Sequence, residues 1–275
     1  MTAQLHTANA SLGRTAPREE TPLPAPHLVS LVSATSFPAE QYRILRHTVE
    51  QRHRDQDVRV VAVTGPGGGE GKTSTSINLA GALAQARETR VLLFEADLRR
   101  PSILRQLGLS TEGRGLVDAV LDASLGIADV VRSCPDYNLY VLPAGHPPLA
   151  PYEVLKSHRM GELLQEARAA YDYIVVDTPP VVPCPDYRLL EKLLDGTVLV
   201  VAADKTPRQV VDAAAALIDP AKMLGLVFNG ENGRDTRYQD HYYAAPPAAR
   251  RPLLRHVSDT VASLRRSAPW SSKRR

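Results

Sequence analysis

The chain has 275 residues, of which 43% are hydrophobic and 23% are charged, a composition that predicts one folded α/β domain with tails rather than two complete domains. Its formal net charge of +3 is too small to indicate a nucleic-acid-binding protein. No apolar run approaches the roughly 18 residues of a membrane span, and no signal-peptide core opens the chain, so a cytoplasmic location is expected. Cys134 and Cys184 stand far apart in sequence, which argues against a disulfide framework or a thiolate metal site.

Residues 1–36 are rich in Pro, Ala, Thr and Ser without periodicity, and they are predicted to be a disordered tail. A single folded domain is predicted over residues 37–233, and a second tail over residues 234–275.

The folded part is predicted to begin with a helix over residues 37–54, with Pro38 in its first turn. Helical spacing places three apolar side chains on one face, Tyr42, Leu45 and Val49. It places three charged side chains on the other, Glu40, Arg43 and Arg46. The simplest interpretation of the charged face is exposure to solvent, because exposed charge pairs are common and weak.

The next segment, VRVVAVTGPGGGEGKTST at residues 58–75, passes from a β-branched apolar run through glycines into a helical pattern. This order predicts a strand, a phosphate-binding loop and a helix, because glycines let backbone N–H groups surround phosphate oxygens at a helix N-terminus. The residues expected to contact a nucleotide are Gly67, Gly68, Gly69, Glu70, Gly71, Lys72, Thr73 and Ser74.

Two loop residues have distinct expected roles: Lys72 neutralises the β- and γ-phosphates, and the Thr73 hydroxyl ligates Mg²⁺. The strict pattern G-x-x-x-x-G-K-[ST] is broken at Pro66, which occupies the position of its first glycine. The residues that touch phosphate are kept, so the loop is interpreted as a variant. A glycine-rich turn without a ligand is the alternative.

A second buried strand is predicted in RVLLFEADLRRP, and two acids, Glu95 and Asp97, follow at its end. Acids at the carboxyl end of a strand beside a phosphate loop lie where ligands bind in open α/β sheets. Both are therefore candidates for contacting Mg²⁺ or accepting a proton. The alternative is that Asp97 caps a helix and Glu95 pairs with an arginine at the surface.

A third strand pattern, YDYIVVDTPP, places Asp177 at its end, where a hard cation beside a phosphate loop needs an oxygen ligand. Asp186 precedes a helical pattern and is expected to cap that helix, although a functional role stays open. Between the second and third of these strands, the sequence predicts helices at residues 115–120, 128–131 and 152–170 and a strand at residues 138–145.

Two further strands, TVLVVAAD and KMLGLVFNG, flank a helical stretch at residues 208–217. The alternation of buried strands with helices predicts a three-layer, doubly wound, mostly parallel α/β sheet. Asn229 ends the last strand on the ligand side. Its amide is expected either to read an adenine edge or to form a turn before Gly230.

The C-terminal region carries three tyrosines close together, Tyr238, Tyr242 and Tyr243, which suit a docking patch or a phosphorylation site. Beyond them, PLLRHVSDTVASLRR spaces apolar residues along one helical face. That pattern fits a partner-binding helix, a membrane-surface helix or a segment without stable structure.

Together, GPGGGEGKTST, FEADLRRP and IVVDTPPV resemble the Walker A, Walker A-prime and Walker B motifs of the bacterial tyrosine kinases of capsule and exopolysaccharide biosynthesis. The resemblance covers residues 39–243. AEQYRILR is similar to the family's ring-forming Glu-x-x-Arg-x-x-Arg pattern at Glu40, Arg43 and Arg46, and the tyrosine-rich segment is similar to its autophosphorylation cluster.

The resemblance implies a P-loop kinase that uses ATP and Mg²⁺ to phosphorylate Tyr238, Tyr242 and Tyr243 of a neighbouring subunit within a homo-oligomeric ring. It implies Lys72, Glu95, Asp97 and Asp177 as catalytic residues, with Thr73, Asp97 and Asp177 around the metal. It also implies a membrane-anchored polysaccharide co-polymerase adaptor as activator, which recruits the chain to the inner face of the membrane, and a cognate tyrosine phosphatase. Glu95 stands where the family has Asp, so Glu95→Asp is expected to raise the rate.

Two alternatives stay open. One is a positioning ATPase like the MinD and ParA proteins, whose signature Lys near the start of the loop is replaced here by Gly67. The other is a catalytically weak nucleotide-binding scaffold that regulates a polysaccharide machine through assembly alone.

Overall fold

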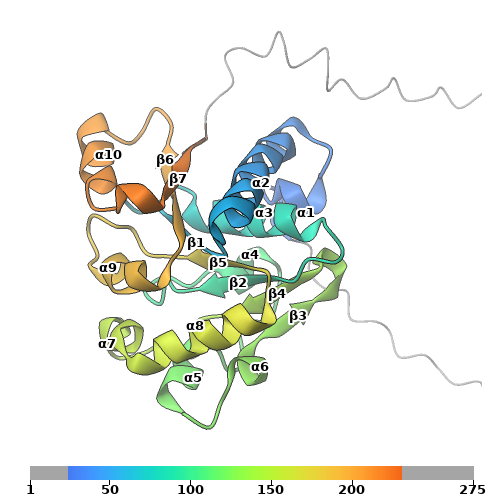
Figure 1. Ribbon diagram of the computed structural model, residues 1–275, viewed down its shortest axis with the longest axis vertical. Helices are drawn as coiled ribbons and strands as arrows, with labels where there is room; N and C mark the ends of the chain where they lie inside the picture. Colours follow the sequence, from blue (N-terminus) through green and yellow to red (C-terminus); the bar gives the residue numbers. More distant parts are fainter. Residues whose placement is uncertain (1–23, 231–275) are drawn as a thin grey trace, which may run out of the picture. The chain divides into compact units, whose positions relative to one another are not determined.

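A computed structural model of the protein describes residues 24–230, and these residues contain a seven-stranded sheet in the order β3-β4-β2-β5-β1-β6-β7 (Figure 1). The strands are β1 (Val60–Thr64), β2 (Val91–Glu95), β3 (Arg132–Cys134), β4 (Leu139–Leu142), β5 (Tyr173–Asp177), β6 (Gly196–Ala202) and β7 (Met223–Asn229). Neighbouring strands run parallel except for β3 and β4, which pair antiparallel. The predicted mostly parallel α/β sheet is confirmed.

The helices of the described part are α1 (Val29–Val32), α2 (Phe37–Gln56), α3 (Lys72–Ala84), α4 (Ile103–Gln106), α5 (Leu116–Leu121), α6 (Ile127–Val130), α7 (Pro151–Lys156), α8 (His158–Ala170), α9 (Asp186–Leu190) and α10 (Arg208–Ala215). The helix predicted over residues 152–170 is interrupted at Ser157. The side-chain oxygen of Ser157 accepts a hydrogen bond from the Met160 amide at 3.3 Å, so a cap begins a second helix there.

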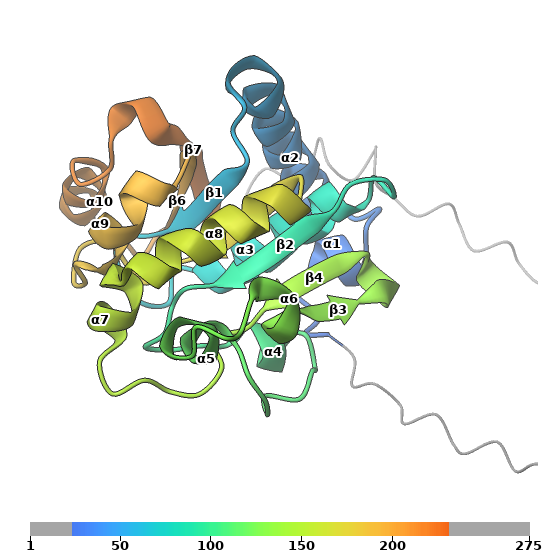
Figure 2. The same ribbon diagram turned by 60° about the horizontal axis from the view of Figure 1, so that its bottom comes forward.

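Helices cover both faces of the sheet, as Figures 1 and 2 show. Val61, Val63, Leu93 and Val175 of the strands face one side and pack with α3, Val49 of α2, and α4. The residues that alternate with them along the strands face the other side, because successive strand residues point to opposite faces.

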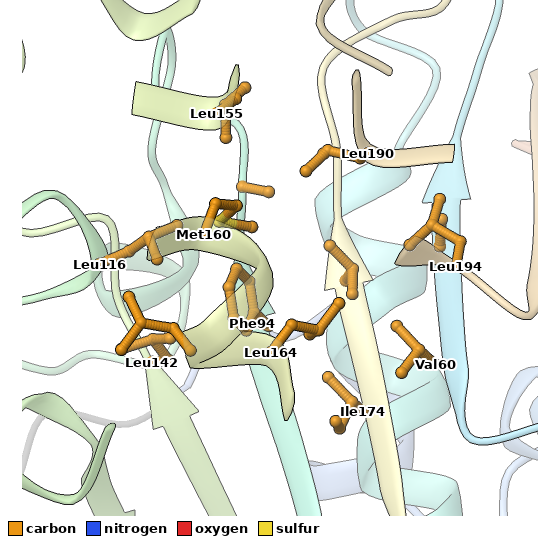
Figure 3. Close-up of a cluster of buried hydrophobic side chains, with 14 of the residues drawn as sticks. Val60, Phe94, Leu116, Leu142, Leu155, Met160, Leu164, Ile174, Leu190 and Leu194 are labelled. Carbon is orange, nitrogen blue, oxygen red and sulfur yellow. The ribbon is translucent and has the colours of Figure 1, made fainter. Parts of the chain in front are cut away.

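The core on that second side joins the sheet to α5, α6, α7, α8, α9 and α10. Figure 3 shows Phe94 and Ile174 of the sheet meeting Leu164 and Met160 of α8, with Leu190 of α9 close by. Burial of β-branched and aliphatic side chains on both faces stabilises the parallel strands and fixes where each one ends.

The predicted disordered tail over residues 1–36 is wrong for residues 24–36. Leu28 is fully buried, and the Ser30 amide donates a hydrogen bond to Asn78 Oδ1 of α3 at 2.9 Å. Leu31 packs closely against Gly81 of α3, where an added Cβ on the glycine would lie 2.6 Å from Leu31 Cδ2. The segment is ordered by α3 rather than by its own periodicity, which is why its sequence shows no helical pattern. The rest of the predicted tails, residues 1–23 and 231–275, lies outside the described residues.

Within residues 24–230, no helix combines the length and the apolar character that a membrane crossing requires.

Candidate functional site

The strands that carry the predicted site residues are neighbours: β5 lies between β2 and β1 in the sheet. Parallel strands end at the same edge, so the loops that follow these three strands meet there. They enclose a pocket of about 550 Å³. Its walls are the phosphate loop with the start of α3, the loop after β2 with α4, and the loop after β5. The residues that line it are Gly68, Gly69, Gly71, Lys72, Thr73, Ser74, Asp97, Arg99, Arg100, Ser102, Arg105, Gln106, Pro179, Pro180, Pro183 and Cys184.

The loop between β1 and α3 has the backbone of a phosphate-binding loop. Gly69 and Gly71 adopt φ angles of 80° and 89°, a region that disfavours side chains. Lys72 opens α3, and its Nζ donates to the carbonyl oxygen of Gly67 at 2.8 Å, which folds the ammonium group back over the loop. Burial lowers the pKa of Lys72, an effect that the nearby Asp177 and Asp97 oppose.

Glu70 and Asn229 brace the loop from outside. The Glu70 Oε2 accepts hydrogen bonds from the Thr206 hydroxyl at 2.7 Å and from the Ala202 amide. Asn229 Nδ2 donates to the Glu70 carbonyl oxygen at 2.9 Å. Neither side chain lines the pocket. The partners of Glu70 lie at and just after the end of β6, and Asn229 itself ends β7, so the two side chains join the phosphate loop to these strands. Their contacts with a nucleotide, and a turn at Asn229 before Gly230, stay predictions.

Asp177 at the end of β5 lies directly behind the loop, and its side chain is buried. Its Oδ2 accepts from the Thr73 hydroxyl at 2.7 Å and its Oδ1 accepts from the Ser76 hydroxyl at 3.0 Å. Burial raises the pKa of Asp177 to about 7, although the two hydroxyl donors oppose the shift. Ser76 was missed in the sequence, where its position one turn after Thr73 on α3 is the signal that could have found it.

Thr73 and Asp177 fit a magnesium ion that is held jointly with a nucleotide. Mg²⁺ prefers hard oxygen ligands and keeps several waters, so it is bound by one or two carboxylates together with phosphates. In the described part of the chain, no cluster of three or more His, Cys, Asp or Glu residues forms a metal cage. One buried carboxylate and one hydroxyl at the mouth of a phosphate loop are the donor set that such shared coordination uses.

The two acids after β2 differ in their surroundings. Glu95 is 2% exposed, and its Oε1 accepts from the amides of Ser102 and Ile103, the latter at 2.8 Å. Its Oε2 accepts from the Ala144 amide at 3.1 Å. Burial is the main cause of a raised pKa for Glu95. The alternative of a surface pair with an arginine is therefore wrong.

Asp97, in contrast, lines the pocket, and its Oδ1 accepts from the amides of Arg99 and Arg100 at 3.2 and 3.1 Å. It does not cap a helix. The amides at the start of α4 are bound by Glu95 instead, so Asp97 is the one of the two acids that the fold presents to a ligand.

Asp186 does not cap a helix with its side chain, so this expectation is wrong. Its carboxylate is 1% exposed and accepts two hydrogen bonds from Arg99, from Nε at 2.7 Å and from Nη2 at 3.1 Å. Arg99, Arg100 and Arg105 also line the pocket, although none of them was predicted as a site residue. Their grouping within seven residues after a strand-terminal acid was the signal available.

The charged face of α2 makes contacts within the chain. Arg43 pairs with Glu40 and donates to the Ala34 carbonyl oxygen at 2.7 Å. Arg46 pairs with Glu50 at 2.7 Å and donates to the Ala82 carbonyl oxygen near the end of α3 at 2.8 Å. The face is thus not simply solvated. The predicted phosphoacceptors Tyr238, Tyr242 and Tyr243 and the amphipathic pattern after them lie outside the described residues.

Several known proteins are similar to this chain in both sequence and fold. An AAA domain family model matches residues 58–191, which span the phosphate loop, both acidic strand ends and α9. The chain is 36% identical over 207 residues to the tyrosine-protein kinase YwqD of Bacillus subtilis, covering 74% of this chain and 86% of that protein. It is 28% identical over 221 residues to the tyrosine-protein kinase wzc of Salmonella typhi, covering 78% of this chain and 30% of that much longer protein.

Among solved structures, the chimerical protein CapA2B2 superposes with a TM-score of 0.69 at 27% identity, over 75% of this chain and 90% of that one. The septum site-determining protein MinD of Pyrococcus horikoshii, complexed with Mg-ADP, superposes with a TM-score of 0.53 at 22% identity, over 64% and 73%. The likeness to MinD shows a common fold. The 36% identity to YwqD over 86% of that protein shows that the chain belongs to the family of bacterial tyrosine-protein kinases.

Proposed function

We propose that this protein transfers the γ-phosphoryl group of ATP to tyrosine hydroxyls with the help of Mg²⁺, and that it thereby regulates the polymerisation and export of a capsular polysaccharide or exopolysaccharide. The observation that carries the proposal is the joining of three parts at one pocket. These are the phosphate loop, the hydrogen-bonded pair of Thr73 and Asp177, and the carboxylate of Asp97. Family membership supports tyrosine as the acceptor.

The residues would divide the work by position. The loop amides and Lys72 would bind the phosphates. The Lys72 ammonium would release its hydrogen bond to the Gly67 carbonyl oxygen and donate to phosphate oxygens instead. Thr73 and Asp177 would hold Mg²⁺, which when bound neutralises the charge on the phosphates. Phosphoryl transfer is mostly positioning and charge stabilisation, so a preformed loop supplies most of what the reaction needs.

Asp97 would contact the acceptor and take up the proton of the tyrosine hydroxyl as the new P–O bond forms. It is the only acidic side chain among the described residues that line the pocket. Glu95 would act through the backbone, because both of its carboxylate oxygens are bound to amides that position α4 and the loop after β4.

The substrates and partners of the proposal come from the family. The acceptors are Tyr238, Tyr242 and Tyr243 of a neighbouring copy in a homo-oligomeric ring, in which α2 supplies Glu40, Arg43 and Arg46 to the subunit contact. A membrane-anchored polysaccharide co-polymerase adaptor recruits and activates the chain at the inner face of the membrane, and a cognate tyrosine phosphatase reverses the reaction. Relatives that are named tyrosine kinases and the similarity to the chimerical CapA2B2 support this assignment.

The test is detection of phosphotyrosine on the purified chain after incubation with ATP and Mg²⁺, with mass spectrometry to locate the phosphate. Lys72→Met should abolish the signal, because the phosphates lose their cation. Hydrolysis of ATP by the wild type without phosphotyrosine would support the positioning ATPase instead. Nucleotide binding without either reaction, with the adaptor present, would support the scaffold.

A further inference from the structure

The arginines of the pocket wall stand apart from the phosphate loop. Arg99 and Arg100 follow β2, and Arg105 lies on α4, whereas the phosphate loop follows β1. Because β5 lies between β2 and β1, the arginine wall and the phosphate loop occupy the two sides of the β5 loop in one pocket. The phosphates of a nucleotide have their own partners in the loop amides and Lys72, so the arginine side is left to another ligand.

Arg99 is held in place by the fold. The buried Asp186 carboxylate binds its guanidinium group through two hydrogen bonds of 2.7 and 3.1 Å, and this pair neutralises its charge. Arg100 and Arg105 are exposed, and neither side chain forms an ion pair or hydrogen bond with any residue between 24 and 230.

The charges of the wall do not balance. Asp97 is the only carboxylate that lines the pocket in the described part of the chain, and one of its oxygens already accepts from two backbone amides. Arg100 and Arg105 therefore bring two positive charges to this side of the pocket, and the single carboxylate of Asp97 balances only one of them. A ligand that carries a negative charge next to the reacting group fits such a wall.

We propose that Arg100 and Arg105 form the acceptor subsite and select tyrosines that have a carboxylate two residues away, a proposal that rests on the kinase function proposed above. An extended peptide advances about 7 Å over two residues, so a tyrosine whose hydroxyl reaches Asp97 places such a carboxylate on the neighbouring surface of the pocket. The sequence itself contains this pattern, because Asp240 stands two residues from both Tyr238 and Tyr242.

The test uses the full chain with ATP, Mg²⁺ and two synthetic peptides that contain one tyrosine each. The peptides differ only at the residue two positions after the tyrosine, Asp in one and Asn in the other. The wild type should phosphorylate the Asp peptide with about a three- to tenfold higher kcat/KM, since an exposed ion pair is worth up to about fivefold in affinity and two arginines contribute. The double variant Arg100→Gln/Arg105→Gln should treat both peptides alike at an unchanged KM for ATP.

Two further variants sharpen the test. Arg87→Gln is the matched control, because Arg87 is also an exposed arginine but precedes β2, at the amino end of the strand and away from the pocket, and it should keep the preference. Arg100→Glu/Arg105→Glu should prefer a third peptide with Lys at the same position, a gain that a misfolded variant cannot produce.

Each outcome decides one point. If the wild type phosphorylates the Asp and Asn peptides equally, the acceptor subsite is wrong while the kinase function stands. If the glutamine variant raises the KM for ATP and lowers the rate with both peptides by the same factor, the arginines serve the nucleotide and the proposal is overturned. If the wild type phosphorylates none of the peptides and no tyrosine of its own, the kinase function itself fails, and the subsite fails with it.

Discussion

Glu95 shows how one carboxylate can determine the shape of a pocket that it does not line. It joins the start of α4 to the loop after β4 through three backbone amides. Its length suits this task, because one oxygen reaches Ser102 and Ile103 while the other reaches Ala144.

Glu95→Asp should therefore lower the rate of tyrosine phosphorylation, opposite to the increase that the family motif suggests. The shorter side chain cannot bind both sets of amides, and the lost hydrogen bonds should reduce the free energy of unfolding by about 1–3 kcal/mol. Urea denaturation and initial rates measure the two effects, with the exposed Glu88→Asp as the control. A faster enzyme of unchanged stability would show that Glu95 contacts the reacting groups after all.

Asp177 should make the stability of the ligand-free protein depend on pH. Its pKa is about 7 in the fold against an ordinary value of 3.8, so between these values the folded protein holds a proton that the unfolded chain has released. The free energy of unfolding should fall as pH rises from about 4 to 7, by an amount on the order of 3 kcal/mol.

Denaturant titrations at a series of pH values measure this slope. Asp177→Asn should flatten it and should make the ligand-free protein more stable than the wild type at pH 8, while weakening the binding of Mg²⁺ with nucleotide. The exposed Asp55→Asn should leave the slope unchanged. An identical slope in wild type and Asp177→Asn would assign the pH dependence to other groups.

The sequence was a good guide to residues that a local sequence pattern positions, even where their partners are distant. Lys72 and Thr73 could be placed because the loop and the helix N-terminus form within a few residues, and Asp177 because a strand end fixes its position. The contacts that Glu70, Glu95 and Asn229 make within the chain were not predicted, since their side chains bind backbone groups of segments far away in sequence. No local pattern records such a contact.

At the scale of elements, the junction between the phosphate loop and β7 depends on one glycine. Gly71 has a φ angle of 89°, and a Cβ there would lie 1.9 Å from Asn229 Nδ2. Gly71→Ala should displace Asn229 or the loop and should weaken nucleotide binding by at least about tenfold, since a phosphate site fails when its amides move by about 1 Å. Calorimetric titration with ATP and Mg²⁺ measures the loss.

Gly68→Ala is the matched control for that substitution. Gly68 lies in the same loop and lines the same pocket, but a Cβ there meets nothing within 4 Å. It should bind nucleotide like the wild type. Equal losses in the two variants would mean that any side chain in the loop obstructs phosphate, and that the contact with Asn229 has no special part.

The helix α2 makes a second element-scale prediction, because Arg46 ties α2 to the end of α3 through the Ala82 carbonyl oxygen. Arg46→Ala should reduce the free energy of unfolding by about 1–2 kcal/mol even in the monomer, in addition to any effect on a ring. Arg52→Ala, which loses only a contact to Gln56 on an exposed part of the helix, should change it by less than about 0.5 kcal/mol.

Assembly needs a separate measurement by light scattering with ATP and Mg²⁺ present. If both arginines of the pattern contribute to a ring, Arg43→Ala/Arg46→Ala should be monomeric at a concentration where the wild type associates. If the variant dissociates only to the extent that its folded monomer is destabilised, Arg43 and Arg46 do not contact a neighbouring subunit directly.

Elements with a strong period of their own were predictable, including α2, α3 and the core strands β1, β2, β5 and β6. The short α1 and α4 were not, because each is held by tertiary contacts: Leu28 and Leu31 against α3, and the α4 amides by Glu95. The break between α7 and α8 was not predicted either. It depends on the cap at Ser157, and the apolar spacing and helix propensity of the sequence continue unchanged across that residue.

For the whole molecule, alternating strands and helices predicted the sheet and its parallel sense, but not the order of its strands. That order decides what the pocket contains, because it places β5 between β2 and β1. The antiparallel β3 at one edge also escaped prediction, since three residues of mixed polarity carry no strand signal.

The strand order also has a consequence for how the chain folds. Val60 pairs with Ile174 and Val91 pairs with Tyr173, so β5 is synthesised well after both of its neighbours in the sheet, β1 and β2. The entropy cost of closing such long loops must be met before the contacts between the strands stabilise the chain, so this pairing is expected to form late and slowly. A nucleotide then finds no partial site to bind, so it should slow unfolding without speeding folding, and the lifetime of the native protein should lengthen in the presence of its substrate.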